Sequence, residues 1–377
     1  MKALVIGTAA SMWVKEFIGR VLLPEGMEVT VLRDPTAKCK YSDFYEENGV
    51  KFAGLYTPSS FMMKIPRIRK YYKQRRTIKA LSEIREKFDY IFIVSSVAFY
   101  VKCAGIVYQE GTKVFALYIG SDILRAKDKD IAVMKPELSR MKAVIVPVSK
   151  KPEAACARRL LDGKKPDHVI DFGSSQIECI DAYSKEGRGA SKSALGIDED
   201  ALTICVGHNG FESQQHLKLL DAISSLPPVL KDRVTLILPM TYGGRKKYRA
   251  EVKDAAGSFR HVIFDSFMDS DTVARLRVAS DVYINAQVTD ALSTSMLEHI
   301  YAGCEVLVGS WLSYPELREW GVSIGEFADF NELAGLIEKR LVGQSANKEE
   351  LERNHQILHR YLSWETCRKK WHEVVFG

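Results

Sequence analysis

The chain has 377 residues, of which 46% are hydrophobic and 27% are charged, and its formal net charge is +6. These values describe a soluble globular protein that is too long for one ordinary domain, so we expect two domains. The seven cysteines are odd in number and form no Cys-x-x-Cys pair, which argues for a reducing compartment and against a disulfide framework or a zinc site.

The N-terminal half alternates predicted strands with helical segments. It opens with a strand at 3–6, too short an apolar run for a signal peptide, followed by a helix at 11–23. Buried strands separated by helices are typical of a parallel sheet covered on both faces. The turn after the first strand lacks Gly-x-Gly-x-x-Gly, which disfavours a dinucleotide-dependent dehydrogenase. Further apolar runs predict strands at 28–32, 89–94, 113–118 and 143–147.

The segment 64–79 concentrates positive charge and contains no acidic residue. Aromatic and aliphatic side chains are interleaved with its basic ones, as in helices that lie on an anionic membrane. The alternatives are a solvated helix packed on its own sheet, or nucleic acid as the anion; of the two anions we expect the membrane. The eight basic residues are Lys64, Arg67, Arg69, Lys70, Lys73, Arg75, Arg76 and Lys79.

The segment 90–108 is nearly all apolar, with Lys102 as its one charge. Its length would make it a marginal membrane span. We favour a buried strand at 90–94 and a helix at 97–108, because the start is rich in β-branched and aromatic residues and two serines interrupt the run.

The turn Gly120-Ser121-Asp122 follows the predicted strand at 113–118. Loops at the carboxyl ends of parallel strands line the ligand crevice, so Asp122 is a candidate to accept a hydrogen bond or a proton from an acceptor hydroxyl. The competing interpretation is an Asx cap for the next helix.

The polar stretch 183–200 predicts an interdomain linker, and a second alternating block follows it. Strands are expected at 202–206, 234–238, 262–264, 282–286 and 306–308, with helices such as 216–226 and 271–279 between them. Two strand-to-helix turns of this block are candidate ligand loops, and Arg245 is a candidate to pair with a diphosphate unless it lies on an exposed helix start. The residues singled out there are Gly207, Asn209, His216, Tyr242, Gly243 and Arg245.

A strand, a polar loop and a helix start follow one another between Asp281 and Gly309. The helix is predicted to begin at Ser293-Thr294-Ser295, whose hydroxyls would cap it, and its unpaired amides form a ready anion site. Asp290 and Glu298 are eight residues apart, and both are candidates to accept hydrogen bonds from sugar hydroxyls. A capping box from Ser295 to Glu298 is the structural alternative.

This acidic-x7-Glu pattern resembles the Glu-x7-Glu motif of family 4 glycosyltransferases, which have the GT-B architecture. In that family the first acidic residue lies by the donor sugar and the second holds the ribose, which would assign those roles to Asp290 and Glu298. The sequence departs from the family by its first Asp, by 291–293 in place of Gly-Phe-Gly, and by 208–216, which lacks the usual Arg and Lys. The Tyr-Gly-Gly turn and the Asn209-x6-His216 spacing are similar to lipid-linked aminosugar transferases of enterobacterial common antigen.

The resemblance implies an α/β GT-B fold with two doubly wound, Rossmann-like domains facing across a cleft. We expect an acceptor domain at 1–185, a nucleotide-sugar domain at 195–360, and a final helix at 363–377 that packs back on the first domain. The implied activity is sugar transfer, with retention and without a metal or other cofactor, from a nucleotide-diphosphate sugar to a lipid-linked or polysaccharide acceptor. The expected location is cytoplasmic, at the inner face of the membrane, alongside other glycan-assembly proteins. A sugar-nucleotide epimerase or hydrolase, or an inactive binding subunit, are the alternatives.

Overall fold

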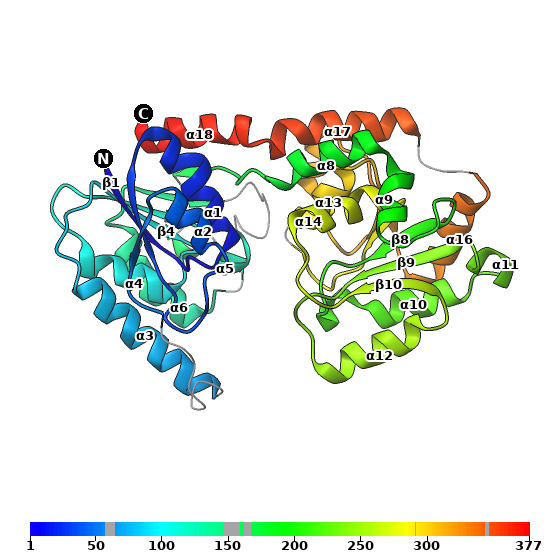
Figure 1. The fold of residues 1–377 in the computed structure, drawn as a ribbon, viewed down its shortest axis with the longest axis horizontal. Helices are drawn as coiled ribbons and strands as arrows, with labels where there is room; N and C mark the ends of the chain where they lie inside the picture. The colour runs from blue at the N-terminus through cyan, green and yellow to red at the C-terminus, as the bar shows by residue number, and fades with distance from the viewer. Residues whose placement is uncertain (57–64, 125, 147–158, 162–166, 291, 344–346) are drawn as a thin grey trace. The chain divides into compact units, whose positions relative to one another are not determined.

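The computed structural model describes residues 1–56, 65–124, 126–146, 159–161, 167–290, 292–343 and 347–377 (Figure 1). They form two compact units: Met1–Gly173 with Trp364–Gly377, called unit 1, and Ser174–Ser363, called unit 2.

Unit 1 contains a sheet of parallel strands in the order β3-β2-β1-β4-β5-β6-β7. Side chains alternate across it: Val5 and Phe92 pack on one face, and Leu4 and Ile91 on the other. The sequence patterns predicted five of these strands, but not β3 or β7, which are too short to carry a period. The strands are β1 (Lys2–Ile6), β2 (Glu28–Leu32), β3 (Lys51–Ala53), β4 (Tyr90–Val94), β5 (Lys113–Leu117), β6 (Ala143–Val146) and β7 (His168–Val169).

Helices cover both faces of this sheet. Residues of α1, the π-helical turn that continues it, and α18 join one core, and residues of α3, α4 and α6 pack on the opposite face. The bounds are α1 (Met12–Phe17), η1 (Ile18–Leu22), η2 (Leu23–Glu25), α2 (Ser42–Glu47), α3 (Pro66–Ser82), α4 (Ala98–Val107), α5 (Ser121–Leu124), α6 (Asp128–Leu138) and α18 (Trp364–Phe376).

The last helix, α18, is anchored in unit 1 by its tryptophans. Trp371 is fully buried, its ring lies 5.3 Å from that of Phe17, and its Nε1 donates to the carbonyl of Asp171 at 3.1 Å. Gly173 leaves room for Trp364, since an added Cβ would lie 2.7 Å from the indole. The seven-residue spacing of the two tryptophans therefore serves packing within unit 1.

Unit 2 contains a second parallel sheet in the order β10-β9-β8-β11-β12-β13. Helices α10, α12 and α16 contribute to the core on one face, and α8, α13, α14 and α17 to the core on the other. The strands are β8 (Leu202–Val206), β9 (Val234–Pro239), β10 (Arg260–Phe264), β11 (Val282–Asn285), β12 (Glu305–Gly309) and β13 (Gly325–Phe327). The helices are α8 (Gln176–Glu186), α9 (Arg188–Ala194), η4 (Glu212–Gln214), α10 (His216–Ser224), α11 (Pro228–Lys231), α12 (Lys246–Ala256), α13 (Ser270–Ala279), α14 (Thr294–Tyr301), α15 (Pro315–Trp320), α16 (Phe330–Leu341) and α17 (Lys348–Leu362).

The prediction of a linker at 183–200 is wrong, and the boundary lies earlier than the expected 185. Helices α8 and α9 occupy most of this stretch and belong to unit 2. Arg188 and the buried Lys192 pair with Asp281 at 2.7 and 2.9 Å, just before β11. The polar residues that suggested a linker thus form ion pairs that hold α9 to the sheet.

The apolar segment 90–108 is β4 followed by α4, as predicted. Within the described ranges, no helix combines the length and apolar composition needed to cross a bilayer.

Candidate functional site

Unit 2 has a topological switch point between β8 and β11. The chain continues from β8 to β9 on one side of the sheet, whereas β11 pairs with β8 on the other side. Loops at the carboxyl ends of such strands diverge and leave a crevice, which is where open α/β sheets bind ligands. The predicted donor-binding residues lie on the loops after β8, β9 and β11 or on α14, except His216, which is the first residue of α10.

The loop after β8 has a tightly constrained backbone. Gly207 has a φ of +67°, and an added Cβ would lie 2.7 Å from the Oε1 of Gln214. Gln215 adopts a φ of 58°, an uncommon conformation for a residue other than glycine. The Gln214 side chain accepts from the His208 amide at 3.2 Å. These constraints fix His208 at the end of β8.

The Tyr-Gly-Gly turn after β9 packs against the loop after β8. The amide of Gly210 donates to the carbonyl of Tyr242 at 2.8 Å, and an added Cβ at Gly244 would overlap the Gly210 carbonyl oxygen at 1.9 Å. Gly243 and Gly244 both have positive φ, so this turn requires glycine. Arg245 is largely exposed at the start of α12 and pairs with Glu212 at 2.7 Å.

Asp290 sits in the loop after β11 within a set of donors. Its Oδ2 accepts from Tyr314 Oη at 2.8 Å, and from Asn285 Nδ2 and the Ser293 amide at 3.2 Å each. Within the described part of the chain, every group that donates a hydrogen bond to this carboxylate donates it to Oδ2. The carboxylate is therefore held in one orientation by three groups, with the second oxygen available.

Helix α14 begins as predicted, but the expected hydroxyl cap is not found among the described residues. Ser293 is the N-cap residue and no side chain of the described residues caps there. The Ser295 to Glu298 capping box does not form, because the N-cap lies two residues before Ser295. Within the described part of this loop, no side chain is found that accepts from the first-turn amides of α14, which leaves these amides for an anion.

Glu298 is 8% exposed and forms a buried ion pair. Its Oε2 lies 3.2 Å from Nε of Arg277 on α13, and its Oε1 accepts from the Ser174 hydroxyl at 3.0 Å. Arg277 was not singled out from the sequence, because nothing in the pattern of α13 separates it from an exposed helical arginine.

Three histidines, His208, His216 and His299, lie close to the crevice. Nδ1 of His208 is 3.3 Å from the hydroxyl of Tyr283, and Tyr283 stacks on His299 with ring centroids 4.2 Å apart. Burial lowers the pKa of His208 to about 4, with Asp290 opposing and Arg277 adding to the shift. Burial also lowers the pKa of His216 to about 4 and that of His299 well below its ordinary value. All three imidazoles are therefore neutral near pH 7 and can both donate and accept.

Buried polar atoms without a hydrogen-bond partner gather in this region. Among the described residues they include Nε2 of Gln214, Gln287 and His299, and Nη1 of Arg277. Buried polar groups are almost always bonded, so a cluster of exceptions points to a polar ligand. Gln287 and His299 could be found only once the fold brought the two loops and α14 together.

Aromatic side chains surround the same loops. Phe211 and Tyr242 are 47% and 56% exposed and meet edge to face at 6.2 Å. Trp311, after β12, is 39% exposed and donates to the carbonyl of Gln287 at 2.7 Å. Exposed aromatic faces beside a polar crevice suit the stacking of a flat ring.

Asp122 in unit 1 is bonded to its own turn. Its Oδ1 accepts from the amides of Ile119 and Ile123 at 3.0 Å each, and its Oδ2 accepts from Ile119 at 3.2 Å. Burial raises the pKa of Asp122, and these amides oppose that rise. The preceding Gly120 has a φ of +109°. Asp122 thus lies within the first turn of α5 and bonds amides of its own turn, whereas an acceptor role stays a prediction.

Four of the basic residues of α3 fall into two groups. Arg67 and Arg69 are exposed in the first turn, whereas Lys73 pairs with Asp34 at 2.5 Å and Arg76 lies over the ring of Tyr72 at 5.6 Å. Lys64 and the apolar residues just before it lie outside the described residues.

Comparison with solved structures identifies the fold. The Anabaena protein HepE, solved with UDP and glucose, aligns with a TM-score of 0.70 at 14% identity over 100% of this chain and 99% of that one. Sucrose-phosphate synthase from Thermosynechococcus elongatus aligns with a TM-score of 0.72 at 14% identity, over 99% and 97%. A glycosyltransferase from Rickettsia africae aligns with a TM-score of 0.69 at 15% identity, over 100% and 99%. A scan against protein-family models and a sequence search of curated proteins find no match. The two parallel-sheet units thus have the GT-B fold that the sequence predicted.

Proposed function

We propose that the chain is a glycosyltransferase that takes a sugar from a nucleotide-diphosphate sugar bound at the β8–β11 switch point of unit 2. The observation that supports this most comes from the described residues: buried polar atoms without a hydrogen-bond partner surround that crevice, beside a start of α14 that no side chain caps. A sugar nucleotide supplies both the hydroxyls that such atoms bond and the diphosphate that a helix start binds.

Each part of the donor has a candidate partner. The diphosphate binds the first-turn amides of α14 at 293–295, with Arg245 released from its exposed pair with Glu212. Asp290 presents Oδ1 to the sugar. Glu298 takes a ribose hydroxyl: a carboxylate has about four acceptor positions, and its bonds to Ser174 and Arg277 use two.

Catalysis would come mainly from stabilising the departing diphosphate. Preorganised amides and a cation do this in a site from which water is excluded, so the proposal needs no metal ion. Neutral His208, at the end of β8, is placed to donate to a sugar or phosphate oxygen. The family 4 resemblance implies retention of the anomeric configuration.

The acceptor is proposed to bind unit 1 over Gly120, Ser121 and Asp122, and to be a lipid-linked or polysaccharide glycan at the inner face of a membrane. The exposed Arg67 and Arg69 on α3 support an anionic membrane contact, together with Lys73 and Arg76. We expect the double variant Arg67→Gln/Arg69→Gln to lose salt-sensitive binding to anionic liposomes, with about 1 kcal/mol per removed charge. Equal liposome binding by the variant and the parent chain would remove the membrane part of the proposal.

An inactive binding subunit is the second candidate. It is favoured by the bonds that occupy Glu298 and by the pairing of Arg245 with Glu212. An epimerase or hydrolase would share the donor crevice and release its product without an acceptor.

A thermal-shift series of nucleoside diphosphates and their sugars tests the donor site. UDP-glucose comes first, because HepE has been solved with it. A ligand present at a hundred times its Kd stabilises the chain by about 2.7 kcal/mol, and an Asp290→Asn variant should lose more of the shift with UDP-glucose than with UDP. If no sugar nucleotide raises the melting temperature, the donor assignment is wrong.

A further inference from the structure

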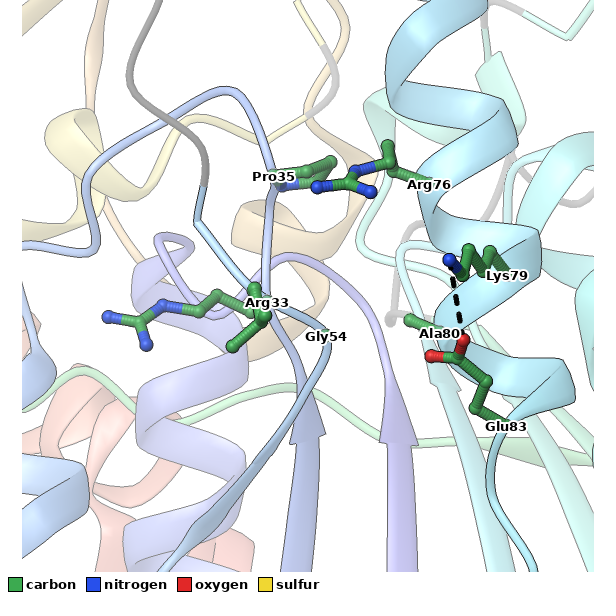
Figure 2. A pocket seen from close by; sticks show the side chains of 8 residues that line it. Arg33, Pro35, Gly54, Arg76, Lys79, Ala80 and Glu83 are labelled. Carbon is green, nitrogen blue, oxygen red and sulfur yellow. Dashed lines mark ion pairs between the residues drawn. The ribbon is translucent and has the colours of Figure 1, made fainter.

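Unit 1 contains a basic cavity separate from the turn of Asp122. It has a volume of about 260 Å³ and lies where β2 and β3 end and α3 passes over them. Figure 2 shows its wall of α3 side chains facing the loop that follows β2. At a share of about 30 Å³ per water molecule, the cavity exceeds a single anion and accommodates a small organic group beside it.

Two cations line the cavity from one side. The guanidinium of Arg76 reaches toward Pro35, and Nζ of Lys79 points to the same space one turn further along α3 (Figure 2). Arg33 extends away from both and lies over the ring of Phe52 at 4.5 Å, so it adds charge nearby without filling the cavity. A planar guanidinium beside an ammonium is the pair that binds phosphate oxygens well.

Two carboxylates of the described residues lie near the cavity, and each is engaged in a pair of its own. Asp34 is paired with Lys73 at 2.5 Å and accepts from the Thr36 amide and hydroxyl. Burial would raise the pKa of Asp34, but these bonds bring it below its ordinary value, so its charge stays committed to them. Glu83 lies 3.6 Å from Lys79, and both side chains are about two-thirds exposed, so this pair is weak and can open.

The rest of the wall is small and apolar. Pro35, Leu55 and Ala80 line it, and Gly54 comes so close to α3 that an added Cβ would lie 3.0 Å from that of Ala80. The cavity therefore offers two cations at one wall and carbon surface beside them.

We propose that this cavity binds a phosphomonoester, with the phosphate between Arg76 and Lys79 and the carbon portion against Pro35, Leu55 and Ala80. A dianion matches two cations better than the single charge of a phosphodiester. The phosphate belongs either to a small soluble metabolite or to the headgroup of a lipid. This inference does not depend on the donor site in unit 2.

Calorimetric titration of the full chain with inorganic phosphate and glucose 6-phosphate tests it for soluble ligands. We expect saturable binding that Arg76→Gln/Lys79→Gln weakens at least about tenfold, because each substitution removes a charge-assisted hydrogen bond to the phosphate. The matched control is Lys102→Gln/Lys129→Gln, which removes the same charge from exposed positions of unit 1 outside the cavity and should bind as the parent does. Glu83→Gln should tighten binding by up to about fivefold, a gain that a damaged fold cannot produce.

Vesicles of phosphatidylcholine with phosphatidic acid or with phosphatidylglycerol separate the two sources. If the soluble probes fail but the chain prefers phosphatidic acid, and Arg76→Gln/Lys79→Gln removes that preference, the phosphate is a lipid headgroup. If no probe binds saturably, or both double variants lose binding equally, or Glu83→Gln weakens it, the proposal is overturned. UDP-glucose binding by each variant reports on the donor site, so failure of either assignment is visible by itself.

Discussion

The two units have the same strand order about their centres, but they differ in the side chains that lie at the carboxyl ends of the central strands. In unit 1, Gly7 comes directly after β1 and lies close to the end of β4, so that an added Cβ would be 2.9 Å from the Val94 carbonyl oxygen. The buried Ser96 hydroxyl donates to the carbonyl of Ile93 at 2.8 Å. In unit 2, the same edge carries His208, Gln287 and Asp290. Small residues therefore line the switch point of unit 1, whereas large polar residues line the switch point of unit 2.

The difference shows that the strand order of a unit does not determine which side chains line its switch point. Strand order places a crevice in each unit, and both edges hold a non-glycine residue with positive φ, Ser95 at 62° and Gln215 at 58°. Such strained positions cluster at functional sites. In unit 1, however, the acidic side chain at this edge is satisfied by amides of its own turn, and the excess charge lies on α3 instead. The proposed donor site therefore lies at the centre of unit 2, whereas the anion cavity proposed for unit 1 lies away from its centre.

The largest effect is expected from Glu298→Ala. This change leaves the guanidinium of Arg277 buried without its partner, which should lower the free energy of unfolding by about 3–5 kcal/mol, with a large loss of turnover. Urea denaturation and sugar-transfer assays measure the two effects. Asp122→Ala is the matched change in unit 1 and should lower the free energy of unfolding by only about 1–3 kcal/mol, because it frees backbone amides rather than a charge. Equal losses in the two variants would break the contrast between the units.

The next effect is acid sensitivity of unit 2. The folded pKa of His216 is about 4, below the ordinary value of 6.5, so between these values the unfolded chain binds the proton more readily. Stability is full above about pH 6.5 and falls with decreasing pH, by about 1.4 kcal/mol per pH unit for this side chain. His216→Gln should flatten the dependence of the free energy of unfolding on pH within that window. The raised pKa of Asp122 acts with the opposite sign, because its folded form takes up a proton before the unfolded chain does. An unchanged slope in the His216 variant would contradict a buried neutral imidazole.

The sequence was sufficient for the central strands of both sheets, but it missed the short edge strands β3, β7 and β13 and only partly predicted the crevice. Apolar runs predicted β1, β2 and β8 nearly residue for residue, because a strand buried on both faces is apolar throughout. The helix start after Asp290 was also predictable. The partners of Glu298 were not, because Ser174 and Arg277 lie 124 and 21 residues away and meet it only when the start of α8 and helix α13 pack against α14. For the same reason the polar stretch at 183–200 was misassigned, since its ion pairs with Asp281 are long-range.

The smallest effect should also be the most selective. Tyr314→Phe removes the 2.8 Å hydrogen bond to Oδ2 of Asp290 and keeps the buried ring. If Asp290 contacts the sugar, UDP-glucose should bind about fivefold more weakly, equivalent to about 1 kcal/mol, whereas UDP alone should bind as before.

The matched control is Tyr301→Phe, whose lost hydroxyl bonds Asp181 at 2.8 Å in the same unit. It removes the same kind of bond to a carboxylate and should leave both ligands unaffected in a calorimetric titration. A loss shared equally by UDP and UDP-glucose in the Tyr314 variant would mean that this loop holds the nucleotide. The polar edge of unit 2 would then bind the donor by its phosphates and base. Asp290 would hold the conformation of its loop instead of contacting the sugar.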